Sequence, residues 1–166
     1  LGFKEVIALD PKTIEDRFRL GEKEGAAQLF VGTLTKGIMG GGFLYTNQES
    51  LSLGIVVGVH SLNQREPREE IYKFLDELKE RPEIKNLIKG GEVVEYSAHL
   101  ISEGGIHIKP KVYGDGILVT GDAAGLGLNM LVTVRGMEYA MASGVLAGRT
   151  IKMAKEKNDF SASTLS

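Results

Sequence analysis

The sequence predicts an α+β fold with a mixed or antiparallel sheet, and three observations support this class. Residues 42–47 (GFLYTN) and 51–59 (LSLGIVVGV) have the composition of strands, and the polar segment 47–50 between them favours a hairpin. Residues 65–84 carry apolar side chains three and four positions apart, which is typical of a helix with one buried face. Repeated strand–helix–strand units and internal linkers are not visible in the sequence.

The N-terminal elements are less clearly marked. Residues 3–9 (FKEVIAL) fit either a strand or a short helix, and periodicity leaves both open. A helix is expected over 10–20, because Asp10 suits the N-cap and Pro11 suits the first helical position. The segment 24–32 (EGAAQLFVG) remains ambiguous.

The middle and C-terminal elements follow in order. The helix at 65–84 places Ile71, Phe74, Leu75 and Leu78 on one face, and a short companion helix over 83–89 ends at Gly90 and Gly91. Beyond it the expected elements are strands at 92–101 and 106–108 around a turn at Gly104 and Gly105, a loop at 109–116, a buried strand at 117–121 and a helix from about 131 to 156.

Size and composition exclude several classes. With 166 residues the chain can form one domain with a substantial core, and its net charge of −2 argues against nucleic acid as the main partner. It has no cysteine, so it carries no disulfide, thiolate zinc site or cysteine-bound iron–sulfur cluster. No apolar run reaches the roughly 18 residues that span a bilayer. Because the chain starts at Leu1 and ends in a polar segment, we expect a piece of a longer protein.

Residues 117–131 (ILVTGDAAGLGLNML) carry the chemistry. Asp122 follows an apolar strand, where ligands of α/β sheets tend to bind, and its carboxylate can accept hydrogen bonds from sugar-like hydroxyl groups. Small residues around it leave room for a flat ligand. Free backbone amides of Gly127, Leu128 and Asn129 would begin the next helix and favour an anionic group such as the edge of a reduced flavin. The alternative is that Asp122 only caps the helix and the glycines only turn the chain.

The following helix has one face with almost no side chains. Gly136, Ala140, Gly144 and Gly148 recur every four residues, and Ser143 and Ala147 widen this strip. Glycine inside a helix costs roughly 1 kcal/mol relative to alanine, so a close contact must offset it. We therefore expect this face to pack tightly on a sheet.

Residues 113–148 (YGDGILVTGDAAGLGLNMLVTVRGMEYAMASGVLAG) resemble the second flavin-binding motif of FAD-dependent oxidoreductases. The fold implied is that of geranylgeranyl reductases and p-hydroxybenzoate hydroxylase. More narrowly, this segment and residues 36–59 are similar to the FixC family, flavoprotein dehydrogenases that resemble electron-transfer-flavoprotein:quinone oxidoreductases. The resemblance covers about residues 3–160. It implies part of a catalytic sheet domain over 1–112, the closing strand and long helix of the FAD-binding domain over 113–160, and a polar tail at 161–166.

The resemblance also implies roles for single residues. Asp122 would match the acid that binds the ribityl chain of FAD, flanked by Gly121 and Ala123, and the backbone of Gly127, Leu128 and Asn129 would lie near the pyrimidine edge of the flavin. Residues 41–45, with Gly42, Phe43 and Tyr45, would line the cavity over the isoalloxazine ring. Related reductases often have a tryptophan there, and this chain has none, which makes isoprenoid reduction less expected. Tyr45 could equally be a half-buried aromatic residue of the hairpin.

The implied function is electron transfer from an electron-transfer flavoprotein, through FAD, to a quinone or a ferredoxin-like protein. No acid–base catalyst can be named. The alternatives are an isoprenoid or geranylgeranyl-type flavin reductase, and a non-catalytic structural module. The expected location is the cytoplasm, with at most peripheral attachment at the inner face of the membrane. Since the Gly-x-Gly-x-x-Gly motif for the ADP half of FAD is absent, the isolated chain should bind FAD weakly or not at all.

Two further groups of residues have plain explanations. His60, His99 and His107 are far apart in the sequence, so no metal site is expected. Arg135 could orient the flavin loop, but an ion pair on the surface is the simpler expectation.

Overall fold

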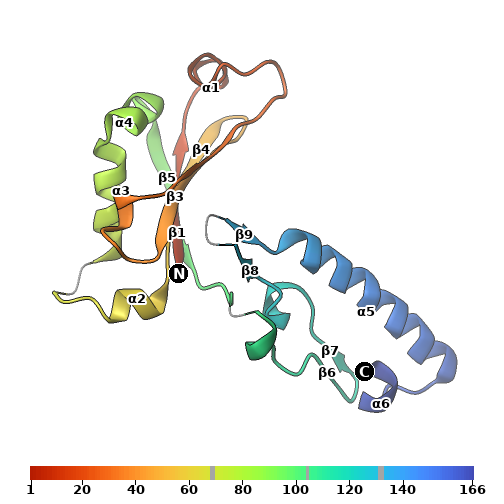
Figure 1. Ribbon diagram of the computed structural model, residues 1–166. Coiled ribbons are helices and arrows are strands. Elements are labelled where there is room, and N and C mark those ends of the chain that lie inside the picture. The colour runs from red at the N-terminus through yellow and green to blue at the C-terminus, as the bar shows by residue number, and fades with distance from the viewer. Residues whose placement is uncertain (68–69, 104, 131–132) are drawn as a thin grey trace. The chain divides into compact units, whose positions relative to one another are not determined.

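The computed structural model describes residues 1–67, 70–103, 105–130 and 133–166. The chain divides into two units, Leu1–Leu100 and Ile101–Ser166 (Figure 1). The first unit contains a five-stranded sheet with helices, and the second is built around one long helix with short hairpins. The predicted α+β class with an antiparallel sheet is confirmed.

The sheet of the first unit has the strand order β2-β3-β4-β1-β5, and every neighbouring pair is antiparallel. Its strands are β1 (Gly2–Ala8), β2 (Ala27–Phe30), β3 (Gly40–Thr46), β4 (Ser50–Val57) and β5 (Glu92–His99). The predicted hairpin is confirmed, with Thr46 opposite Leu51. The two segments that periodicity left open, 3–9 and 24–32, supply strands β1 and β2.

In the part of this unit that the structure describes, four helices and a short 3₁₀ turn accompany the sheet. They are α1 (Pro11–Phe18), η1 (Thr33–Thr35), α2 (Val59–Asn63), α3 (Ile71–Glu80) and α4 (Pro82–Ile88). Helix α1 begins as predicted, because the Asp10 carboxylate accepts a hydrogen bond from the Thr13 backbone N–H at 3.0 Å. Helix α3 begins later than predicted. A proline disfavours helical backbone in the residue before it, so Pro67 separates 65–66 from the helix; Arg68 and Glu69 lie outside the described residues.

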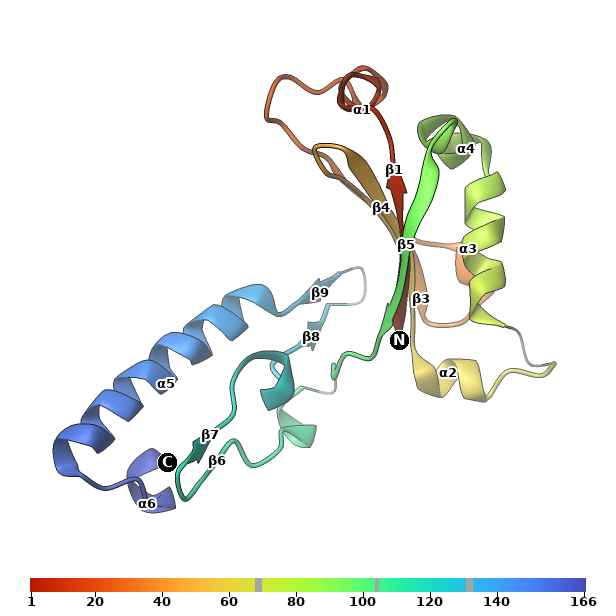
Figure 2. The same ribbon diagram turned by 180° about the vertical axis from the view of Figure 1, so that it is seen from behind.

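Helices α3 and α4 cover one face of the sheet, as both ribbon views show (Figures 1 and 2). Phe74, Leu75 and Leu78 of α3 are buried against the sheet, which contributes Leu44, Leu53 and Ile55 to the same core. The two helices are separated at Arg81, whose extended backbone (φ −65°, ψ 135°) is the conformation favoured before Pro82. The predicted apolar face of the helix therefore supplies much of the core.

The described residues of the second unit form two small hairpins, two 3₁₀ turns and two helices. Its elements are η2 (Ile106–Ile108), β6 (Tyr113–Gly114), β7 (Ile117–Leu118), η3 (Gly121–Ala124), β8 (Leu128–Asn129), β9 (Val134–Arg135), α5 (Met137–Lys157) and α6 (Ala162–Leu165). Strand β6 pairs with β7, and β8 with β9. Leu165 of α6 is buried, so the segment predicted as a polar tail contributes to packing.

Three element predictions in this unit are wrong. Residues 106–108 form a 3₁₀ turn instead of a strand, and the turn before them has Gly105 in the left-handed region (φ +67°), while Gly104 lies outside the described residues. The strand expected to be buried at 117–121 has only two residues, and Ile117 is 56% exposed because the strand pairs only with β6. The long helix begins at Met137, not near 131.

The late start of α5 follows from strand pairing next to its N-terminus. The residues before it include β-branched Thr133 and Val134, which favour extended backbone, and Val134 pairs with Asn129 in the β8–β9 hairpin. Leu131 and Val132 lie outside the described residues. The small-residue strip begins only at Gly136, the N-cap of the helix.

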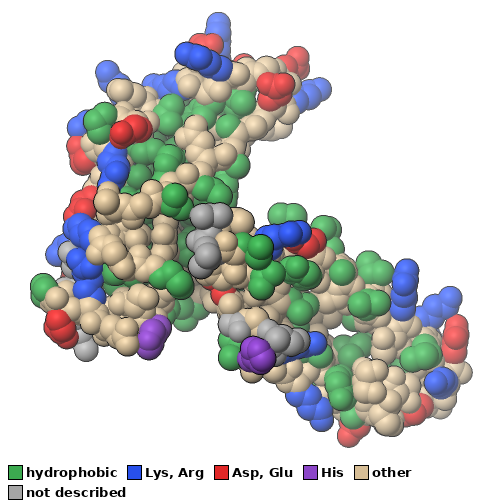
Figure 3. Space-filling view, in the orientation of Figure 1, with side chains coloured by type: hydrophobic (Ala, Val, Ile, Leu, Met, Phe, Trp, Pro, Cys, Tyr) green, Lys and Arg blue, Asp and Glu red, His purple; other side chains and the backbone are tan. Residues whose placement is uncertain are grey.

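The tight packing expected along α5 is not supplied by the described part of the chain. A Cβ atom placed at Gly144 or Gly148 would have no neighbour within 4 Å. Met141, Val145 and Leu146 are each more than half exposed, and hydrophobic side chains are visible on the surface over α5 (Figure 3). The helix is thus apolar but largely uncovered.

Candidate functional site

The turn η3 presents Asp122 on the surface of the second unit. Gly121 and Gly125, which begin and follow the turn, have φ angles of +66° and +69°, a region that glycine enters without strain. These two glycines therefore do turn the chain, as the structural alternative proposed. Asp122 and Ala123 between them are exposed.

Asp122 does not cap the long helix. The N-cap of α5 is Gly136, which has no side chain, and the Asp122 carboxylate makes no hydrogen bond to that helix end. Within the described residues no donor bonds to the Asp122 carboxylate, although its Oδ1 atom lies 3.7 Å from where a Cβ atom of residue 136 would be. An exposed carboxylate that accepts no hydrogen bond from the chain can accept several from a ligand.

Helix α5 holds this turn through a residue that sequence reasoning noted only for its small size. The Ser143 hydroxyl accepts a hydrogen bond from the Gly121 backbone N–H at 3.1 Å and donates one to the Ala140 carbonyl oxygen at 2.8 Å. The only available signal was a hydroxyl group on the small face of the helix.

The segment with Gly127, Leu128 and Asn129 lies in a hairpin and not at a helix N-terminus, so that part of the prediction is wrong. A Cβ atom on Gly127 would lie 2.6 Å from the Ser102 carbonyl oxygen, which shows how closely the two backbones approach. The Asn129 side-chain amide donates a hydrogen bond to Glu103 Oε2 at 2.9 Å. Sequence reasoning identified neither Ser102 nor Glu103, because contacts between distant segments leave no local pattern.

The three residues predicted to line a cavity lie on two faces of the sheet in the first unit. Phe43 and Tyr45 alternate with the buried residues of β3 and share the face opposite to α3, with ring centroids 5.1 Å apart and planes 26° from parallel. Gly54 lies opposite Phe43, and an added Cβ atom there would be 2.3 Å from the Phe43 ring. Gly42 faces the helices instead, since its Cβ atom would lie 2.8 Å from the Leu34 side chain.

The perturbed ionisable groups lie elsewhere. Burial by itself would lower the pKa of Lys79, but its hydrogen bonds and charge interactions with Asp76 and Glu5 raise that pKa overall. The pKa of Glu138 is lowered, first by a backbone hydrogen bond at the start of α5 and then by Arg135. The Arg135–Glu138 pair is exposed, as expected for a surface ion pair.

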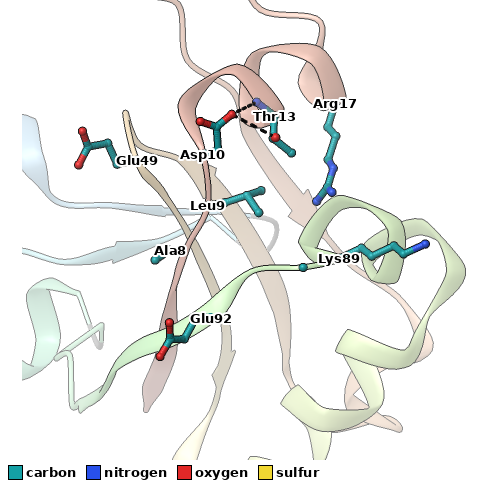
Figure 4. A pocket seen from close by; sticks show the side chains of 9 residues that line it. Ala8, Leu9, Asp10, Thr13, Arg17, Glu49, Lys89 and Glu92 are labelled. Atoms are coloured by element: carbon teal, nitrogen blue, oxygen red, sulfur yellow. Dashed lines mark hydrogen bonds between the residues drawn. The ribbon is translucent and has the colours of Figure 1, made fainter.

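A surface hollow in the first unit contains none of the predicted site residues (Figure 4). Two of its polar groups already have partners: Asp10 caps α1, and Arg17 donates to the Leu87 carbonyl oxygen at 2.8 Å. The lining consists of Ala8, Leu9, Asp10, Thr13, Arg17, Glu49, Lys89, Gly90 and Glu92.

The described residues contain neither a metal-binding cluster nor a membrane-spanning helix. No cluster of three or more His, Cys, Asp or Glu side chains could hold a metal ion there. Among the helices of the same part of the chain, none combines the length and apolar character needed to cross a bilayer.

Comparison with known proteins places these features in a family. A family model described as "ETF-QO, ubiquinone-binding" matches residues 1–101. Protein FixC of Escherichia coli (strain K12) is 47% identical over 161 residues, covering 97% of this chain and 37% of FixC. The probable electron transfer flavoprotein-quinone oxidoreductase YdiS of the same strain is 47% identical over 165 residues, covering 99% of this chain and 38% of YdiS.

A solved structure has the same fold. It is a geranylgeranyl bacteriochlorophyll reductase-like protein of Thermoplasma acidophilum, with a TM-score of 0.64 and 21% identity, covering 99% of this chain and 36% of that chain. The chain thus spans little more than a third of the length of these relatives. The predicted resemblance and fold type are confirmed, and the chain belongs to the ETF-QO family, together with FixC and the electron transfer flavoprotein-quinone oxidoreductases.

Proposed function

We propose that this chain forms the flavin-edge and acceptor-facing portion of an FAD-dependent electron-transfer dehydrogenase. The complete protein would take electrons from an electron-transfer flavoprotein and pass them to a quinone. The relatives that carry these partners in their names support the proposal. A ferredoxin-like protein is the second candidate acceptor, and it would have to supply its own iron–sulfur cluster, since this chain has no cysteine.

The observation that carries the proposal is that the Asp122 carboxylate is exposed and has no hydrogen-bond donor among the described residues. Ala123 beside it is small and exposed, so a chain of hydroxyl groups can approach. A carboxylate can only accept hydrogen bonds, which suits the ribityl hydroxyl groups of FAD. These residues fit the cofactor, and FAD would supply the redox chemistry.

The remaining site residues have supporting roles in this proposal. Gly121 allows the turn, and the backbone of Gly127, Leu128 and Asn129 would contact the pyrimidine edge of the flavin from the β8 hairpin. Phe43 and Tyr45 stack on each other, and the exposed Tyr45 ring could contact a planar ligand. Gly42 would not contact the ligand; its role would be to allow β3 to pack closely on the core.

The proposed acceptor also bears on location. Quinones with long isoprenoid chains dissolve in the membrane, so the complete protein would work in the cytoplasm at the inner membrane surface. The proposed work of this chain is to bind and orient the cofactor and to keep water from it. We assign no proton transfer to any of its residues.

The proposal is tested by FAD binding to this chain mixed with the separately expressed remainder of its parent protein. Flavin fluorescence would be followed for the unaltered chain and for Asp122→Ala. We expect binding in the mixture, weak or no binding to the chain alone, and an affinity loss of about tenfold or more for Asp122→Ala, because a hydrogen bond to a charged acceptor is worth about 1.5–3 kcal/mol.

Asp16→Ala is the matched control, because Asp16 is also exposed but lies on α1 in the first unit. It removes the same charge and should leave the affinity unchanged. An assembled mixture that does not bind FAD, or equal affinities for Asp122→Ala and the unaltered chain, would contradict the proposal.

A further inference from the structure

Ser143 connects the long helix to the turn that carries Asp122. Its hydroxyl group accepts from Gly121 and donates to Ala140, and the contact with Gly121 spans 22 residues of sequence. A hydroxyl group has a single proton, so the bond to Ala140 fixes the direction in which that proton points. An oxygen lone pair is then left for the Gly121 N–H.

The backbone N–H of Gly121 needs a partner from outside the turn. The first N–H groups of a helical turn have no acceptor within it, and the side chain of the N-cap residue Thr120 supplies none. Ser143 supplies the missing acceptor from α5. The bond thereby fixes the peptide group between Thr120 and Gly121, at the start of the turn that carries Asp122.

Two other small residues, at the start of α5, lie against the turn. Gly136 and Ala140 lie seven and three positions before Ser143, so the three residues share one face of the helix. A Cβ atom at Gly121 would be 3.8 Å from the Ala140 Cβ atom, an ordinary van der Waals contact. The turn therefore rests on this face, and Ser143 holds it at one point by a directed bond.

We infer that Ser143 is a positioning residue for ligand recognition by Asp122. The inference rests on the proposed function, in which Asp122 binds the hydroxyl groups of FAD. Because Asp122 accepts no hydrogen bond from the described residues, the direction of its carboxylate depends on its backbone. Without the Ser143 hydroxyl the Thr120–Gly121 peptide can rotate, the turn loses its hydrogen bond to α5, and the Asp122 carboxylate loses its preferred orientation.

The test uses the parent protein that contains this chain, after removal of its flavin. The dissociation constant for FAD would be measured by fluorescence for the unaltered protein, Ser143→Ala, Ser143→Thr, Asp122→Ala and the double variant with both alanines. We expect Ser143→Ala to weaken binding about fivefold, the equivalent of one ordinary hydrogen bond. Ser143→Thr keeps the hydroxyl group and should restore most of the affinity.

The double variant separates positioning from general structural support. Once the Asp122 carboxylate is gone there is nothing left to orient, so adding Ser143→Ala should cause no further loss. Thr150→Ala, on the same helix, is the control, because the Thr150 hydroxyl makes no hydrogen bond in the described part of the chain. The FAD affinity of this variant should equal that of the unaltered protein.

Three results would overturn the inference: unchanged affinity in Ser143→Ala, the same fivefold loss in the Asp122→Ala background, or no recovery with Ser143→Thr. Failure of the unaltered protein to bind FAD is a different outcome. It would reject the proposed function itself, and the role of Ser143 with it.

Discussion

At the scale of single residues, Gly127 shows how the candidate site depends on close backbone contact. An added Cβ atom would lie 2.6 Å from the Ser102 carbonyl oxygen, and a backbone oxygen cannot move aside as a flexible side chain can. We predict that Gly127→Ala lowers the free energy of opening of the β8–β9 hairpin by about 1–3 kcal/mol, as overpacking generally does. Hydrogen exchange of the hairpin amides in the whole chain would measure the change.

Gly2→Ala is the control for this prediction, because the nearest atom to its added methyl group would be 3.7 Å away. It should change the stability of the hairpin by no more than about 0.5 kcal/mol. Equal hairpin stabilities for Gly127→Ala and Gly2→Ala would contradict the close contact between the Gly127 backbone and the Ser102 carbonyl oxygen.

Lys79 is a second residue with a measurable consequence. Its Nζ atom lies 3.1 Å from Glu5 Oε1 and 3.0 Å from Asp76 Oδ1, and its pKa is raised above the ordinary value of 10.5. A pKa that is higher in the folded state contributes stability that is complete below the unfolded value and is lost as the pH rises through the folded value. We therefore predict that the protein loses stability between about pH 9 and about pH 11.5, and that Lys79→Gln loses less.

Urea unfolding at both pH values would check the prediction. Lys85→Gln, which removes a lysine from the exposed pair with Glu80, serves as the control and should behave like the unaltered protein. A pH dependence that persists unchanged in Lys79→Gln would refute the assignment.

At the scale of elements, the long helix α5 has an incomplete environment. No atom lies within 4 Å of a Cβ atom placed at Gly144, and alanine is favoured over glycine in a helix by about 0.5–1 kcal/mol. We predict that Gly144→Ala increases the hydrogen-exchange protection of α5 amides about two- to fivefold in the isolated chain. In the longer parent protein the gain should disappear if a sheet packs on this face. Lower protection in the isolated chain would contradict the prediction.

Some elements could be predicted from the sequence because their causes are local. The Asp10 cap, the hairpin at 47–50 and the apolar face of α3 each depend on residues close together in the chain, and all three are confirmed. The start of α5 was predicted wrongly, because the pairing of Asn129 with Val134 competes with the helix. That competition is decided by pairing, which residue propensities describe poorly.

At the scale of the whole molecule, the candidate site was only partly predictable, because several of its contacts join segments that are far apart in the sequence. The motif around Asp122 identified the turn, but the contacts of Ser143, Ser102 and Glu103 join segments about 20 or more residues apart. Alternation along β3 correctly separates Phe43 from its buried neighbours, yet Gly42 was grouped with it because the prediction followed sequence proximity rather than strand faces.

The distribution of buried residues leads to a prediction about autonomous folding. The main hydrophobic cluster, from Phe3 to Ile84, lies entirely within Leu1–Leu100. In the described part of the second unit the buried hydrophobic side chains are those of Ala124, Ala154 and Leu165, which are too few to offset the entropy of ordering its chain. We predict that residues 1–100 alone unfold cooperatively in urea with a midpoint near that of the whole chain, whereas residues 101–166 alone show no cooperative transition. Circular dichroism of the two pieces would test this, and a cooperative transition in 101–166 would show that α5 needs no further partner to be stable.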